Sequence, residues 1–201
     1  MSTTAAPYGI IPIQLVGGGQ STAGVRQYKL LSNTTTGFYY GDIVNIGAGV
    51  ATPVTATPTT TRNGNTPWGI FVGCSFYDAN GQPQYKQYLP ANGYTTYSGY
   101  GDILLSVMDD PFMTMQIQAT GSVANTDIGK KAALTGFSAG SVTTGNSKVS
   151  LDQSTIATTN TLAVTIIAIA PGPNNAAGDT YTDVWVRWNQ NVHAYNNILG
   201  V

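Results

Sequence analysis

Short runs of strand-favouring residues recur along the chain, and clusters of Gly, Pro, Asn and Ser separate them. The runs follow one another at roughly ten-residue spacing, which is typical of β-sandwiches, jelly rolls and barrels. The run TLAVTIIAIA is apolar on both faces and predicts a central strand. The Asn80-Gly81 pair between two runs predicts a hairpin. We therefore expect an all-β fold, a jelly-roll or barrel-like β-sandwich.

The acidic residues of the chain predict very little helix. All of them are Asp, and Glu is absent. Glu suits helix interiors, whereas Asp favours caps and turns. Thr, Val, Ile and Tyr are abundant instead, and these residues suit strands. We expect one short helical turn, in the segment TDIGKKAAL.

Charged residues make up only 8% of the chain, against about 25% in an average soluble protein. A surface with so little charge predicts that copies of the chain, or a partner, cover much of it. The formal net charge of −1 argues against nucleic acid and anionic membranes as partners. The sequence shows no signal-peptide pattern and no apolar run as long as a membrane span.

Residues 1–24 precede the β domain in the sequence, and we predict that they form an extended arm that lies on a neighbouring subunit. Pro7 and Pro12 disfavour helix, and a run of three glycines follows them. The alternative, the first strand of the domain, stays open. Residues 25–201 are predicted to form a single β domain. The arm's candidate partner-binding residues are Tyr8, Ile10, Ile11, Ile13 and Leu15.

The segment GFSAG matches the pattern of a serine nucleophile, with Ser138 at its centre. Asp residues and then His193 follow it in the order of a hydrolase triad. The pattern requires a helix after the serine, and AGSVTTGNSK is a poor helix former. We therefore expect no enzyme activity, and we expect His193 at the surface. One His and one Cys supply no metal-ligand cluster, so no metal or cofactor is predicted, and Cys74 is expected to be a buried thiol.

Asp109 and Asp110 are adjacent carboxylates between two alternating apolar runs. On a strand they would point to opposite faces, so they do not form a natural acid pair. Pro111 follows them and predicts a break between two strand segments or a bulge at a sheet edge. We expect the two carboxylates to be solvated or to contact a Lys or Arg of a neighbour, which makes both candidate partner-binding residues.

Five tyrosines lie close together between residues 85 and 100. Tyrosine offers a large contact area with a hydrogen-bonding tip, which suits interfaces and sugar stacking. Packing within the fold is the other interpretation, and we favour interface or fold packing over sugar binding. Tyr94 and Tyr97 are the candidate partner-binding residues of this group.

Six motifs follow one another between residues 41 and 193, with gaps at the loops. They are GDIVNI at 41–46, WGIFVGCSFYD at 68–78, ILLSVMDDPFMTMQIQ at 103–118, NTDIGKKAAL at 125–134, SKVSLDQSTIATTNTLAVTIIAI at 147–169 and DVWVRWNQNVH at 183–193. This ordered series, with a strand that ends in Asp-Asp-Pro and a final strand that contains VxxN, resembles the head decoration, or cement, proteins of tailed bacteriophages.

The resemblance implies a structural virion protein without enzyme activity. Such a protein is made in the host cytoplasm, binds the outside of the icosahedral phage head and clamps neighbouring subunits of the major capsid protein. We expect a homo-oligomer, with a trimer favoured over a dimer. The alternative function is a carbohydrate-binding β-sandwich on a phage surface or tail, which the tyrosines suggest. A serine hydrolase acting through Ser138 and His193 is the third hypothesis.

Overall fold

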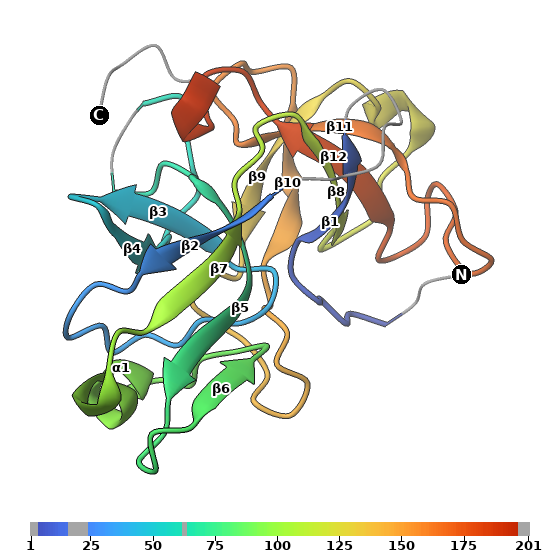
Figure 1. Cartoon of the computed structure of the whole chain (residues 1–201). Coiled ribbons are helices and arrows are strands. Elements are labelled where there is room, and N and C mark those ends of the chain that lie inside the picture. The colour runs from blue at the N-terminus through green and yellow to red at the C-terminus, as the bar shows by residue number, and fades with distance from the viewer. Residues whose placement is uncertain (1–3, 16–23, 62–63, 197–201) are drawn as a thin grey trace.

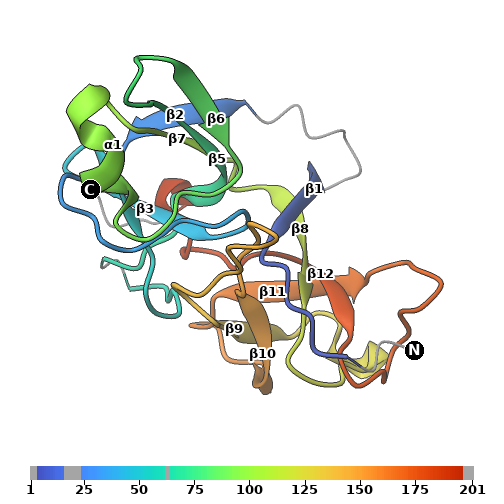
Figure 2. The same cartoon turned by 90° about the horizontal axis from the view of Figure 1, so that it is seen from below.

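The computed structural model describes residues 4–15, 24–61 and 64–196. Strands take up 41% of the chain and helices 7%, in two antiparallel sheets, which confirms the all-β prediction. Figures 1 and 2 show the two sheets side by side. The strand orders within them are consistent with a sandwich but do not single out a jelly roll.

The first sheet has six strands and all its ladders are antiparallel. The strand predicted from TLAVTIIAIA lies inside this sheet, between β12 and β9, as expected of a segment with apolar residues on both faces. The strands, in spatial order, are β1 (Ile11–Leu15), β8 (Met113–Gln118), β12 (Asp183–Trp188), β11 (Val164–Ile169), β9 (Lys131–Thr135) and β10 (Ser150–Ala157).

The second sheet contains the hairpin that Asn80-Gly81 predicts. Strand β6 pairs with β5, and Gly81 has φ +74° in the turn between them. Asp78 closes the turn, because its Oδ1 accepts the backbone N–H of Asn80 at 2.9 Å and that of Gln82 at 3.0 Å. The strands are β2 (Val25–Lys29), β7 (Leu104–Met108), β5 (Gly69–Tyr77), β3 (Ile43–Gly47) and β4 (Val50–Pro53), with β6 (Pro83–Lys86) on β5.

The helices are short. Helix α1 (Gly93–Tyr97) continues into the 3₁₀ turn η1 (Ser98–Tyr100), at the outer end of the second sheet (Figure 1). The turn expected in TDIGKKAAL is the 3₁₀ turn η2 (Asn125–Asp127), and Lys130 Nζ lies 2.8 Å from Asp127 Oδ1. A last 3₁₀ turn, η3 (Ala194–Asn196), closes the described part of the chain.

The apolar residues of the two alternating runs enter two hydrophobic clusters. Leu105 and Val107 of β7 are fully buried in the cluster of the second sheet. Met113, Met115 and Ile117 of β8 are fully buried in the cluster of the first sheet. In β7 the alternation of the sequence matches an alternation in burial, whereas Thr114 and Gln118 of β8 are buried as well.

The chain changes sheets between β7 and β8. The two strands belong to different sheets, and only residues 109–112 connect them. Pro111 has no N–H to offer a ladder, and it stands where the first ladder ends and the second begins. The predicted break between two strand segments is confirmed, and it lies at the junction of the two sheets (Figure 2).

The N-terminal segment requires a correction. Strand β1 pairs with β8 of the same chain, with Ile11 opposite Gln116 and a shift in register between Pro12 and Gln14. Ile10 has no exposed surface, and its N–H donates to Gly41 O at 3.1 Å. Residues 11–15 thus join the chain's own sheet and Ile10 joins its core, as in the first-strand alternative. Residues 1–3 and 16–23 of the predicted arm lie outside the described residues.

Candidate functional site

Asp109 lies at the centre of a polar cluster at the junction of the sheets. Its side chain is only 8% exposed. Its Oδ2 accepts the hydroxyl of Tyr28 at 2.9 Å and that of Tyr195 at 2.8 Å, and Arg26 Nε lies 3.4 Å from the same oxygen. Tyr28 and Arg26 come from β2, whereas Tyr195 comes from η3. The carboxylate therefore joins three segments that are distant in the sequence.

Aromatic rings surround this carboxylate. Trp68 Nε1 donates to the hydroxyl of Tyr28 at 2.9 Å, and the ring of Trp68 meets that of Tyr195 at a centroid distance of 5.1 Å. The expectation that Asp109 is solvated or contacts a neighbour's cation is corrected, because Arg26 and two tyrosines of its own chain occupy its Oδ2. A charged acceptor with several donors holds its surroundings more firmly than a neutral one.

Asp110 has a different and purely local role. Its Oδ1 accepts the backbone N–H of Phe112 at 2.8 Å, which is the hydrogen bond of an Asx turn across Pro111. The two adjacent carboxylates thus bind different groups and do not form an acid pair. Asp110 is half-buried and keeps its place among the candidate partner-binding residues.

His193 is buried, so the prediction of a surface histidine was wrong. It has no exposed surface, and its Nδ1 accepts the backbone N–H of Tyr195 at 3.2 Å. Burial lowers the pKa of His193 to about 4, which keeps the imidazole neutral near pH 7. Ser138 is exposed and has φ +58° in the turn after β9, and no described helix follows it before β10. A nucleophile elbow needs a helix at that position.

The N-terminal candidates pack on the first sheet. The hydroxyl of Tyr8 donates to Asp183 Oδ1 at 3.0 Å and accepts from Gln116 Nε2 at 3.1 Å, and burial raises the pKa of Tyr8. Ile11 and Ile13 are half-buried in β1. Leu15 ends β1, and its side chain lies outside the described residues. These contacts are all within the chain.

The tyrosines between residues 85 and 100 do not share one surface. Tyr97 stacks on Phe76 with ring centroids 4.1 Å apart, and Tyr94 also packs against the second hydrophobic cluster. Tyr88 stacks on Tyr39 with parallel rings, whereas 78% of Tyr85 is exposed. Fold packing accounts for Tyr88, Tyr94 and Tyr97, and not for Tyr85. The side chain of Tyr100 lies outside the described residues.

Cys74 is a buried thiol, as the sequence predicts. It is 3% exposed in the second hydrophobic cluster, and its Sγ lies 3.6 Å from Lys86 O. Burial raises the pKa of Cys74 to about 12, so the unreactive thiol dominates near neutral pH.

A groove with a volume of about 980 Å³ opens beside the outer face of the first sheet. Three of its residues stand in one row, because Thr165 of β11 is paired with Arg187 of β12 on one side and with Lys131 of β9 on the other. Directly paired residues on neighbouring antiparallel strands face the same side. Their neighbours along the strands, such as Val164 and Val186, are buried, so the row points away from the core.

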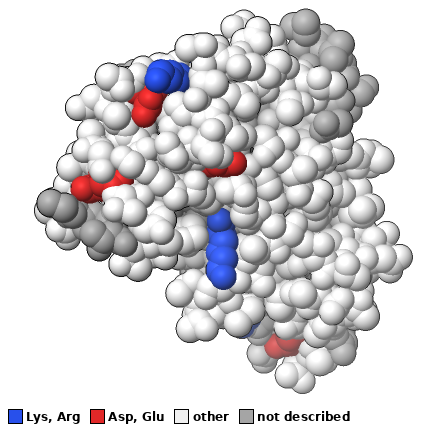
Figure 3. Space-filling model, turned by 180° about the vertical axis from the view of Figure 1, so that it is seen from behind, with Lys and Arg blue, Asp and Glu red and all other residues white. Residues whose placement is uncertain are grey.

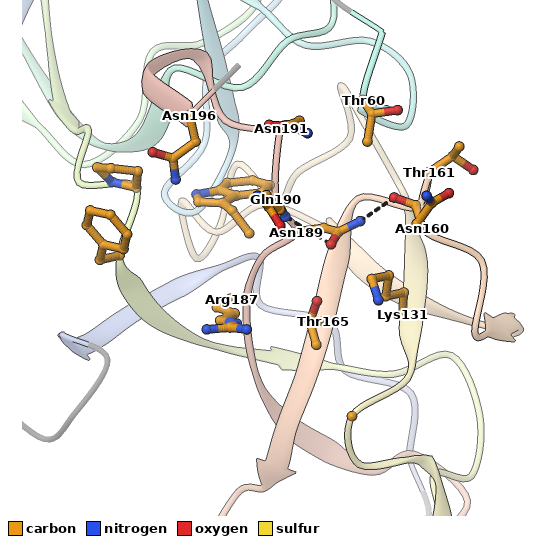
Figure 4. A pocket seen from close by; sticks show the side chains of 14 residues that line it. Thr60, Lys131, Asn160, Thr161, Thr165, Arg187, Asn189, Gln190, Asn191 and Asn196 are labelled. Carbon is orange, nitrogen blue, oxygen red and sulfur yellow. Dashed lines mark hydrogen bonds between the residues drawn. The ribbon is translucent and has the colours of Figure 1, made fainter. Parts of the chain in front are cut away.

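Polar amides and one exposed aromatic ring complete the groove. Figure 4 shows Asn189 and Asn160 beside the row of Arg187, Thr165 and Lys131. Asn189 Nδ2 donates to Asn160 O at 2.7 Å and to Leu162 O at 2.9 Å, which fixes the loop before β11 against the end of β12. None of the residues that line the groove is acidic. The sequence alone did not reveal this site, because its cations come from strands far apart in the chain.

The described residues contain no group of three or more His, Cys, Asp or Glu side chains that could hold a metal ion. None of the helices described here has the length and hydropathy needed to cross a membrane. The comparisons with known proteins find no matching family model, no matching curated protein and no matching solved structure.

Proposed function

We propose that the chain is a structural virion protein that binds the outside of an icosahedral phage capsid and stabilises it by clamping neighbouring major capsid protein subunits. The observation that carries the proposal is the scarcity of charge on the folded surface. Figure 3 shows a face on which Lys, Arg and Asp side chains are few and scattered. A surface with so little charge favours contact with protein over free solution.

Exposed apolar side chains add to this support. Large apolar residues are common at protein interfaces, particularly aromatic ones. Among the described residues, several large apolar side chains have about half or more of their surface exposed to solvent. They are Val25, Tyr77, Tyr85, Phe112 and Val142.

The mechanism is mass action. A subunit that binds only the assembled shell stabilises the shell by its own binding free energy. The described chain exposes 9181 Å², and a standard interface takes about 800 Å² from each partner, roughly a tenth of that surface. One chain therefore has room to contact two neighbouring capsid subunits and copies of itself. A homotrimer is the favoured assembly, and a dimer is the alternative.

The proposal is tested by cryo-electron microscopy and mass spectrometry of purified heads. We expect the protein at fixed positions on the outer surface of the shell. We also expect heads stripped of the protein to break at a lower temperature, and added protein to restore the original value. Finding the protein in infected cells but never in purified heads would refute the proposal.

The alternative is a carbohydrate-binding β-sandwich, which the five tyrosines between residues 85 and 100 suggested. Tyr94 and Tyr97 pack against the second hydrophobic cluster, whereas Tyr85 is exposed. Packed rings do not offer the free faces that sugar stacking requires.

A further inference from the structure

The groove beside the first sheet has a positive charge that the fold does not neutralise. The described chain contains three ion pairs, which use Arg26, Lys29 and Lys130. Neither Lys131 nor Arg187 takes part in an ion pair or a side-chain hydrogen bond within the described residues. Two free cations in a chain so poor in charge, in a groove without a carboxylate, favour an anionic ligand.

The spacing of the cations favours an extended ligand. Arg187 and Lys131 stand on the two strands that flank β11, so roughly 10 Å separates their backbones, twice the distance between neighbouring strands. Thr165 stands between the two cations in the row, so a ligand that contacts both along the row passes over its side chain. A chain-like ligand with acidic groups along its length spans the row and places one anion near each cation.

The strands under the groove exclude one common way of binding a peptide. Strand β11 pairs with β12 and β9, β12 also pairs with β8, and β9 also pairs with β10. All three strands beneath the row are interior, so none offers a free edge to which a peptide could add as a further strand. A ligand in this groove therefore contacts side chains and loop backbone and does not extend a strand ladder.

The side chains of the groove suit hydroxyl-bearing rings. Amides at Asn160, Gln190 and Asn196 carry both donors and acceptors, which match the hydroxyl groups of a sugar. Phe112 is 63% exposed at the groove, so a face of its ring is free for stacking against a sugar. Figure 4 shows the amides on the same side of the sheet as the two cations.

We propose that this groove binds acidic oligosaccharides, with one sugar carboxylate near Lys131, another near Arg187, and neutral hydroxyls on the amides. This inference does not depend on capsid binding. All the residues that line the groove belong to one chain, so the groove exists without a capsid subunit. A protein that fails to bind capsids can still bind such a glycan, and the reverse also holds.

The test is calorimetric titration of the full chain with oligogalacturonate, a chain of uronic acids, and with its methyl ester, which has the same sugar without the charge. We expect binding of the acid form that weakens with added salt, and binding of the ester that is weaker by about tenfold or more. Lys131→Gln and Arg187→Gln should each weaken binding of the acid form by about tenfold.

The matched control is Lys148→Gln, which removes an exposed lysine that does not line the groove. The affinity of Lys148→Gln for the acid form should equal that of the wild type. Thermal melts should show that all three variants are folded. Absence of binding, equal binding of acid and ester, or equal weakening by Lys148→Gln would overturn the proposal. Tighter binding of an oligoglutamate peptide would also overturn it, since the groove would then serve acidic peptides.

Discussion

Replacing Asp109 by Asn should destabilise the fold, because the carboxylate holds the junction of the two sheets. The substitution keeps the shape of the side chain and removes its charge. Hydrogen bonds to a charged group contribute about 1.5–3 kcal/mol and neutral ones about 0.5–1.5 kcal/mol, so each tyrosine contact should weaken by roughly 1 kcal/mol. Tyr195 is 43% exposed, and water reduces its share by about half. The expected total is about 1.5 kcal/mol.

Urea denaturation and thermal melting measure this loss. For a chain of 201 residues, 1.5 kcal/mol corresponds to a fall in Tm of about 3–6 °C. Asp109→Ala should cost more, about 3 kcal/mol, because it leaves the hydroxyls of Tyr28 and Tyr195 without this acceptor.

Asp110→Asn is the matched control, since it removes the neighbouring charge and an Asn oxygen can still accept the N–H of Phe112. We expect its effect to stay within about 0.5 kcal/mol. If Asp109→Asn falls within the same limit, or if Asp110→Asn costs as much, the cluster around Asp109 does not stabilise the junction.

Three further predictions concern buried groups. Burial raises the pKa of Asp42 to about 6 from an unfolded value of 3.8, so its contribution to stability is full below the lower value and is lost as the pH rises through the higher one. Between about pH 4.5 and 7.5, urea unfolding should show the wild type losing about 2 kcal/mol relative to Asp42→Asn; parallel pH profiles would contradict this. Cys74 should react with a thiol reagent at about pH 8 on the order of a hundredfold more slowly in the native protein than in urea, and equal rates would show that it is accessible. Gly69→Ala places a Cβ against Met108 O and should cost about 3 kcal/mol by urea unfolding, whereas Gly47→Ala, which has open space, should change little; equal effects would refute the steric argument.

The sequence predicted those parts of the fold that depend on local patterns. The alternating runs at Leu105 and Met115 gave the core-facing residues, because strand periodicity places every second side chain on one face. The turn at Asn80-Gly81 was equally local. Helix α1 was missed, because its five residues, GYTTY, show no helical signal.

The wrong or missing predictions concern residues at which segments that are distant in the sequence pack together. His193 ends the strand-like run DVWVRWNQNVH, and a strand end favoured a surface position, but the fold buries the ring beside Trp188 and Tyr195. Ile10 stands between prolines and a glycine run, yet it completes a core formed mainly by later strands. The row of Lys131 and Arg187 depends on which strands become neighbours, and single-strand periodicity does not specify that order.

The hydrogen bond from Tyr8 to Asp183 has a consequence for the timing of biosynthesis. The two residues are 175 positions apart in the chain. Ribosomes add about 5–20 residues per second, so roughly 10–35 s pass between the synthesis of the first residue and that of the second. The segment around Tyr8 and Ile10 is made first, yet it can take its final position only after β8 and β12 exist. During that interval its apolar residues are available to chaperones and to neighbouring nascent chains.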